Sequence, residues 1–282
     1  MNAIEIKGLN KRYPGFWLED IDLTLPQGSI MGLVGENGAG KSTLIKLIMD
    51  AIPRDSGTVS VLGVDNQSAR FTAVKEDIGI VLDEAYFPEA LTAKRLGRVM
   101  SYTYRHWDQA RYEGYLQSLS LPAGKEFKDF SRGMKMKLAI AVALSHAPRL
   151  LLLDEATSGL DPMVRDEILD IFNDFTRDDT HSILLSSHIV SDLEKICDYI
   201  AFIHHGKLYF CDEKDRLIEE YALVKLSPQD FEALPAAAVK GVKKGGYGVE
   251  ALVHKPQVNA AFATEHTTLE DIILFMARGD RE

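Results

Sequence analysis

The sequence has few cysteines, no long apolar run and no excess of positive charge. Its two cysteines, Cys197 and Cys211, form no Cys-x-x-Cys pair and have no histidine at metal-ligand spacing, which argues against a disulfide scaffold or a zinc site. The longest apolar stretches, 138–144 and 150–153, are far shorter than the ~20 residues of a membrane-spanning helix. The formal net charge of -10 argues against broad attraction to nucleic acid.

The beginning of the chain also lacks a basic region followed by an apolar core, so we expect no secretory signal and a cytosolic location. With 46% apolar residues among 282, the composition is that of a globular protein with a sizeable core. Strand and helix patterns alternate along most of the chain, which predicts an α/β fold with a mainly parallel sheet. The first strands, near 4–7 and 21–25, alternate like an antiparallel subdomain.

Changes in pattern predict how the chain is divided. Apolar and aromatic residues recur at helical spacing in the segment 87–145, where we expect a helical subdomain. Glycines interrupt short strand-like runs after residue 221, and a helical pattern closes the chain. We therefore expect one large domain at 1–221 and a small α+β accessory domain at 222–282.

A glycine-rich loop follows the buried strand pattern at 29–34 and precedes a helical pattern. Such a loop turns consecutive backbone N–H groups toward an anion, and the helix N-terminus adds its positive end. Lys41 would reach the outer phosphates, Ser42 would bind Mg²⁺, and Thr43 would bond an inner phosphate. The loop residues are Gly35, Glu36, Asn37, Gly38, Ala39, Gly40, Lys41, Ser42 and Thr43.

Two carboxylates follow a second buried strand, at 150–153. They would lie at the carboxyl edge of the sheet, where phosphate ligands bind. Asp154 would support Mg²⁺ through water, and Glu155 would orient and deprotonate the attacking water. An acidic cap on the following helix is the plain alternative.

Taken together with further segments, these motifs resemble the ATP-binding cassette (ABC) family. Residues 130–134 stand where that family has its signature sequence, just before a helix, and residues 158–161 resemble its D-loop. His188 matches the switch histidine that contacts the γ-phosphate. The order and spacing of these segments carry the resemblance, which covers residues 3 to about 220.

The resemblance implies ATP and Mg²⁺ as ligands and a head-to-tail dimer of two cassettes, identical or related. Ser131 and Gly133 would contact the nucleotide of the partner cassette, and Asp161 would lie at the same interface. It also implies a membrane-spanning permease subunit as a partner, so that the chain would lie in the cytoplasm against the inner face of the membrane.

The sequence departs from the family pattern at two places. Asp83 stands where the family has its Q-loop glutamine; it would reach Mg²⁺ through water but lacks the donors of an amide. Glu84 is an alternative ligand, and an acidic loop without a metal role is another reading. In the signature, Arg132 replaces a glycine and Met134 a glutamine, and Arg132 would pair with phosphate or with an acid of the partner.

Several aromatic and histidine positions leave alternatives open. Tyr13 aligns with the aromatic that stacks on adenine in the family, although Phe16 and Trp17 are near enough to take that role. Tyr86 and the next residue, Phe87, stand where cassettes meet the permease, and core packing of Phe87 is equally compatible with the pattern. We expect the histidine pair at 204–205 to form a hairpin turn.

The sequence as a whole predicts the ATP-hydrolysing subunit of an ABC exporter, because residues 267–274 resemble the end of bacterial drug and peptide-antibiotic export ATPases. One alternative is a soluble ABC-type ATPase that acts on nucleic acid or ribosomes. The acidic charge and the single cassette disfavour it, so we expect no nucleic-acid partner. The other alternative is a regulatory nucleotide-binding module with little turnover.

Overall fold

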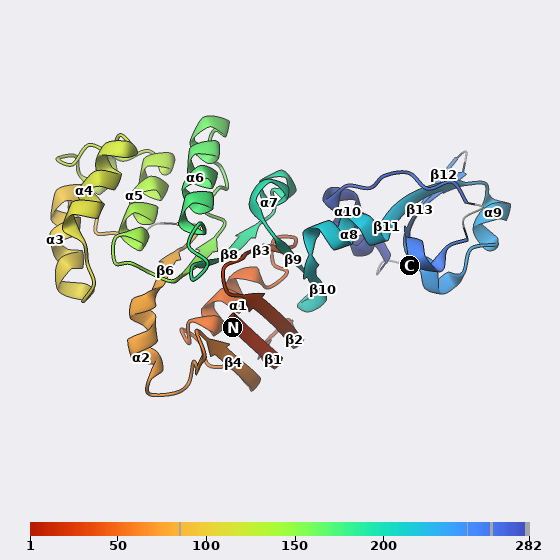
Figure 1. The fold of residues 1–282 in the computed structure, drawn as a ribbon, viewed down its shortest axis with the longest axis horizontal. Coiled ribbons are helices and arrows are strands. Elements are labelled where there is room, and N and C mark those ends of the chain that lie inside the picture. The colour runs from red at the N-terminus through yellow and green to blue at the C-terminus, as the bar shows by residue number, and fades with distance from the viewer. Residues whose placement is uncertain (85, 247, 260–261, 280–282) are drawn as a thin grey trace. The chain divides into compact units, whose positions relative to one another are not determined.

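A computed structural model describes residues 1–84, 86–246, 248–259 and 262–279 (Figure 1). Its contacts divide the chain into two compact units, Met1–Cys211 and Asp212–Glu282. The composition had suggested a division at residue 221. Helix α8 (Lys214–Glu220) lies between the two positions, and it packs on strand β11 (Tyr221–Leu226) and helix α10 (Leu269–Gly279) of the second unit.

A six-stranded sheet forms the centre of the first unit. Its order is β10-β9-β3-β8-β7-β6, and the pairs from β9 to β6 are parallel, as the alternation of strands and helices predicts. Every residue of β3, β7 and β8 is buried, since the sheet is covered on both faces. The strands are β3 (Ile30–Val34), β6 (Ile78–Val81), β7 (Leu150–Asp154), β8 (Ser182–Ser187), β9 (Tyr199–His204) and β10 (Lys207–Glu213).

A smaller antiparallel sheet of order β2-β1-β4-β5 belongs to the same unit, which confirms the predicted antiparallel subdomain. Buried and exposed residues alternate along β2 because one face packs inward and the other meets solvent. The strands are β1 (Asn2–Tyr13), β2 (Phe16–Pro26), β4 (Ser56–Val61) and β5 (Val64–Asp65).

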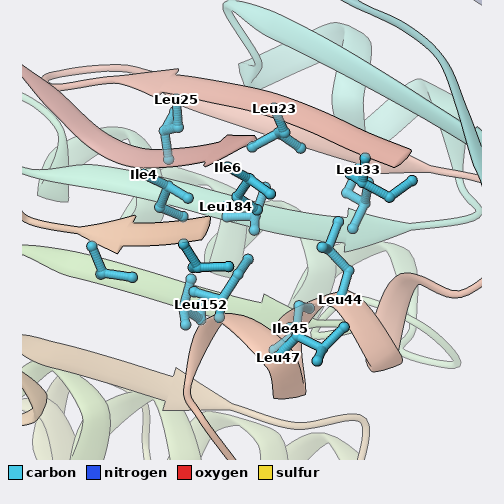
Figure 2. Close-up of a cluster of buried hydrophobic side chains, with 14 of the residues drawn as sticks. Ile4, Ile6, Leu23, Leu25, Leu33, Leu44, Ile45, Leu47, Leu152 and Leu184 are labelled. Carbon is cyan, nitrogen blue, oxygen red and sulfur yellow. The ribbon is translucent and has the colours of Figure 1, made fainter. Parts of the chain in front are cut away.

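Helix α1 (Lys41–Ile48) joins the two sheets into one core. It contacts β7 of the parallel sheet and β4 of the antiparallel sheet, and it directly follows the glycine-rich loop. The position of the loop therefore depends on a core that both sheets share, and burying each large aliphatic side chain in it contributes ~1.5–3 kcal/mol. Figure 2 shows its side chains together: Ile4, Ile6, Leu23, Leu25, Leu33, Leu44, Ile45, Leu47, Leu152 and Leu184.

The predicted helical segment contains three packed helices with an apolar cluster of their own. Tyr112 is buried at the centre of this cluster and donates a hydrogen bond to the carbonyl of Ala93. Phe87 packs edge-on against Phe127 at 5.5 Å, whereas Tyr86 is 77% exposed. The helices of the first unit after α1 are α2 (Phe71–Val74), α3 (Ala93–Thr103), α4 (Gln109–Ser118), α5 (Arg132–Leu144), α6 (Pro162–Phe175) and α7 (Val190–Ile196).

The second unit is a three-stranded antiparallel sheet of order β11-β13-β12 with short helices. Helix α10 packs on β12 and β13. Buried apolar residues of the sheet, among them Ala222, Val224 and Val253, form the core of this unit. In neither unit does any described helix have the length and apolar character to cross a bilayer. The elements are α8, β11 (Tyr221–Leu226), α9 (Pro228–Glu232), β12 (Val239–Gly245), β13 (Gly248–His254) and α10 (Leu269–Gly279).

The expected turn at 204–205 is only half right. His205 has a positive φ of 45° and lies in the turn, but His204 is the last residue of β9 and only 1% exposed. The rings of Phe202 and Tyr209 lie 5.9 and 5.8 Å from its ring. This aromatic surrounding lets a histidine occupy a buried strand position. Cys197 is buried, and Cys211 is half-buried.

His146 gives the fold a predicted pH dependence. Its ring stacks on Tyr104 at 4.0 Å, and Nδ1 contacts the carbonyl of Glu76, yet burial is the largest effect and lowers the pKa of His146. The unfolded chain then binds the proton more readily, so this contribution to stability is full above about pH 6.5 and is lost below it.

We expect the free energy of unfolding to fall less between pH 7.5 and pH 5.5 in His146→Phe, which keeps the stacked ring, than in the unaltered protein. Urea unfolding at both pH values measures this difference. The exposed His106 provides the control, since His106→Phe should leave the difference unchanged. The same pH dependence in the His146→Phe and unaltered proteins would contradict the assignment.

Candidate functional site

The glycine-rich loop borders a cavity of about 340 Å³, which we call the loop cavity. It lies where β3 ends and α1 begins, and Asp83 and Glu155 reach it from the ends of β6 and β7. Parallel strands thus bring three distant segments to one edge of the sheet. The lining residues are Phe16, Glu36, Asn37, Gly38, Gly40, Lys41, Ser42, Thr43, Asp83 and Glu155.

The N-terminus of α1 has no side-chain cap. Its N-cap residue is Gly40, at a φ of 116°, and the first turn holds no acidic residue. By contrast, Ser131 caps α5 and Asp161 caps α6, each by accepting a backbone N–H. The free N–H groups and positive end of α1 therefore face the cavity and suit an anionic ligand.

The loop passes so close to strand β9 at residue 35 that only glycine fits there. A Cβ atom at this position would lie 2.2 Å from the carbonyl oxygen of Ile203 in β9, a backbone atom that has no room to move. Gly35 and Ala39 are buried, and neither belongs to the described lining of the cavity. The close approach at Gly35 constrains the backbone of the loop.

The ammonium group of Lys41 has two hydrogen-bond acceptors and one ion-pair partner. Its Nζ lies 2.8 Å from the carbonyl oxygen of Gly35, 3.4 Å from that of Glu36 and 3.1 Å from Glu155 Oε1. The side chain of Lys41 is only 6% exposed, and a buried ammonium needs such partners. The structure therefore holds the lysine extended along the loop.

Glu155 is held at the cavity from two sides. Besides the Lys41 contact, its Oε2 lies 2.7 Å from Nδ1 of His188, which follows β8. Glu155 also has a φ of 52°, in the left-handed region that a non-glycine residue adopts at a cost of ~1–2 kcal/mol. The structure thus brings together Lys41, Glu155 and His188, the three predicted catalytic residues.

Asp154 is positioned by a residue that the sequence reasoning missed. Ser186 lies opposite it in the parallel pairing of β7 and β8, and Ser186 Oγ donates a 2.6 Å hydrogen bond to Asp154 Oδ1. The same hydroxyl accepts the backbone N–H of Glu155 at 3.1 Å. Polar residues at the end of an otherwise apolar strand were the available signal, because such positions meet at the sheet edge.

Phe16 is the described aromatic residue nearest the loop. It lines the cavity, and a Cβ at Gly40 would lie 2.9 Å from its Cζ, so the ring rests on the loop. Tyr13 is 39% exposed, outside the described lining, and Lys11 Nζ lies 5.3 Å from its ring centre. The structure therefore places Phe16, and not Tyr13, in the described lining of the loop cavity. Stacking of Tyr13 on adenine stays a prediction.

The remaining predicted residues lie on the surface. Asp83 is exposed and lines the loop cavity, whereas Glu84 accepts a hydrogen bond from the hydroxyl of Tyr86 and is absent from the described lining. Ser131 and Asp161 are exposed, and Gly133 is half-buried; none of the three borders the cavity in the described part of the chain. A second chain would be needed to bring such residues to the nucleotide.

The cavity also suits a small divalent cation. Ser42 and Asp83 line the cavity and offer a hydroxyl and a carboxylate, which are oxygen ligands of the kind Mg²⁺ prefers. Asp154 is buried at the end of β7 and lies outside the described lining. The described residues hold no group of three or more histidine, cysteine or acidic side chains placed as a metal cage.

Ser186 gives a prediction for stability. We expect Ser186→Ala to lower the free energy of unfolding by ~1–3 kcal/mol, because the buried Asp154 carboxylate loses its hydrogen-bond donor. Ser187 is equally buried, but its hydroxyl only accepts the N–H of Ile189, so Ser187→Ala should cost less than ~1 kcal/mol. Urea titration of both variants checks the order, and equal losses would contradict it.

Comparisons with known proteins show which sequences this chain resembles. The profile of the ABC transporter family matches residues 18–158. The chain is 32% identical over 225 residues to the ABC transporter ATP-binding protein YtrB of Bacillus subtilis, covering 79% of this chain and 76% of that protein. It is 34% identical over 210 residues to the bacitracin transport ATP-binding protein BcrA of Enterococcus faecalis, covering 73% and 68%.

A solved ATP-binding subunit of an ABC transporter has the same fold. It superposes with a TM-score of 0.70 at 28% identity, over 77% of this chain and 92% of that one. The fold, the phosphate loop with its uncapped helix and the matched sequences lead to one assignment. The chain belongs to the ABC transporter family, as an ATP-binding subunit.

Proposed function

We propose that this subunit hydrolyses ATP to drive export through a membrane-spanning permease, and that the exported compounds are peptide antibiotics or similar amphipathic drugs. The similarity to a bacitracin transport protein supports the direction and the substrate class. Substrate choice would belong to the permease, since the described residues include no membrane-spanning helix. The subunit would then work in the cytoplasm, on the inner face of the membrane.

The observation that carries the proposal is the contact of Glu155 with both Lys41 and His188. ATP phosphates entering the loop cavity would bind the ammonium group of Lys41 in place of Glu155. The γ-phosphate would bind His188 in the same way. Glu155 would then be free to accept a proton from the attacking water. The three side chains therefore form a site in which phosphate binding releases the base.

Mg²⁺ would be held by the Ser42 hydroxyl, with Asp154 and Asp83 acting through water. When bound, the ion would neutralise charge on the β- and γ-phosphates. Ser186 would fix the Asp154 carboxylate by donating to one oxygen, which leaves the other oxygen for the water that binds the metal.

A second cassette, identical or related, would complete the site. Ser131 and Asp161 are exposed, although each also caps its own helix, and the half-buried Gly133 lies in the first turn of α5. In a head-to-tail dimer these residues would face the partner's nucleotide, and hydrolysis would remove the contacts that hold the dimer closed. The exposed Tyr86 suits the contact with the permease.

Replacement of Glu155 tests the proposed hydrolysis. We expect Glu155→Gln to lower ATP turnover by ~10²- to 10⁴-fold, because the amide does not accept the proton of the water. ATP binding should persist, since the shape of the side chain is kept. Phosphate release and ATP binding are measured together, with Glu113→Gln on the exposed side of α4 as the control. Turnover equal to that of the unaltered protein would refute the role of Glu155.

Replacement of the two aromatics tests which one stacks on adenine. We expect Phe16→Ala to weaken ATP binding by roughly tenfold, as the loss of one base–aromatic stack does. Tyr13→Ala should weaken it less. Inorganic triphosphate has no base, so its affinity should be the same for both variants. A larger loss of ATP affinity in Tyr13→Ala would return the role to Tyr13.

A further inference from the structure

The two positions at which the sequence departs from the ABC pattern contact each other. Arg132 Nη2 lies 3.3 Å from Asp83 Oδ1, although the residues are far apart in the chain. Arg132 is the first residue of α5, and Asp83 follows the end of β6. The arginine at a glycine position and the acid at a glutamine position are therefore complementary within one chain.

Asp83 also stands between two cavities. It lines the loop cavity together with Lys41 and Glu155, and it lines a neighbouring cavity of about 310 Å³. That second cavity is bordered by Glu84, Arg132, Lys135 and Met136 as well. One carboxylate therefore has two possible partners, a cation in the loop cavity or the guanidinium in its neighbour.

A third segment holds the guanidinium in place. A Cβ added to Gly159, which has a φ of 68°, would lie 2.8 Å from Arg132 Nη1 and 2.9 Å from Cζ. The arginine thus rests on the turn between β7 and α6 as well as on Asp83. Its side chain is 56% exposed, so the ion pair is a weak link that a stronger charge can exchange.

We propose that Arg132 is a positioning residue that holds the Asp83 carboxylate away from the metal, so that the divalent-cation affinity of the nucleotide complex depends on Arg132. This inference rests on the proposed Mg²⁺ site. An unpaired Asp83 adds a full negative charge beside the loop cavity and attracts the cation, whereas the pair with Arg132 offsets part of that charge. The pair replaces the neutral glutamine and glycine of the family pattern.

The size of the effect follows from the exposure of the pair. A half-exposed ion pair contributes at most ~1 kcal/mol. Because 1.36 kcal/mol corresponds to a tenfold change in an equilibrium constant, this is a change of about fivefold. We therefore expect Arg132→Gln to tighten the binding of Mn²⁺ to the ADP complex by about threefold. Electron paramagnetic resonance of free Mn²⁺ measures this affinity without any turnover.

Lys135 provides the matched control, because it lies in the same helix and lines the same neighbouring cavity. Its Nζ lies over the ring of Phe127 at 4.9 Å, and Lys135→Gln removes a positive charge without breaking the Asp83 pair. We expect Lys135→Gln to change Mn²⁺ affinity less than Arg132→Gln does. Equal changes would show a general charge effect and overturn the inference.

The background variant Asp83→Asn isolates the pair. In that background we expect Arg132→Gln to leave Mn²⁺ affinity unchanged, because no carboxylate remains to be released. A threefold effect that persists there would overturn the role of the pair while leaving the proposed function intact. If the unaltered protein bound no Mn²⁺–ADP, the proposed function would fail, and this inference with it.

Discussion

The ammonium group of Lys41 can donate three hydrogen bonds, and the folded chain supplies three partners for it: two carbonyls of its own loop and the carboxylate of Glu155. An ammonium that is almost fully buried is costly unless it is paired and hydrogen-bonded. The lysine therefore needs Glu155 in the absence of phosphate, and that need places the carboxylate at the cavity. The rest of the site is arranged around this exchangeable pair.

Strand order makes the pair possible. Lys41 follows β3 and Glu155 follows β7, and β8 lies between those strands with Ser186 and His188 at its end. Because all three strands are parallel, their carboxyl ends meet at one edge of the sheet. Ser186 then supports the two acidic residues beside it from its own strand. A change of strand order would separate the lysine from the base without altering either residue.

Local patterns in the sequence predicted the parts of the site that depend on neighbouring residues. A buried strand, a glycine-rich loop and a helix are contiguous, so Lys41 and Ser42 were identified from their spacing, and Glu155 from the strand before it. The overall α/β fold and the helical segment followed from periodicity.

Tertiary contacts decided what the sequence left open. The pairing of Arg132 with Asp83 joins α5 to the loop after β6, and no local signal reports that contact. The hairpin of β1 and β2 turns the ring of Phe16 onto Gly40 of the glycine-rich loop, whereas the choice between Tyr13 and Phe16 for stacking on adenine stays a prediction. His204 was misjudged because the pair precedes Gly206 between two strand-like runs, whereas aromatic neighbours accommodate the first histidine in the strand.

The missing cap of α1 has a further consequence for the protein in the cell. The four N–H groups of a helix start need acceptors, and here the chain provides no side chain for them. Under the proposed function, nucleotide phosphate would act as the cap, so the stability of the fold would be thermodynamically linked to nucleotide concentration. Saturation at a hundredfold excess over the dissociation constant adds about 2.7 kcal/mol. Loss of bound nucleotide would therefore leave the subunit more open to proteolysis.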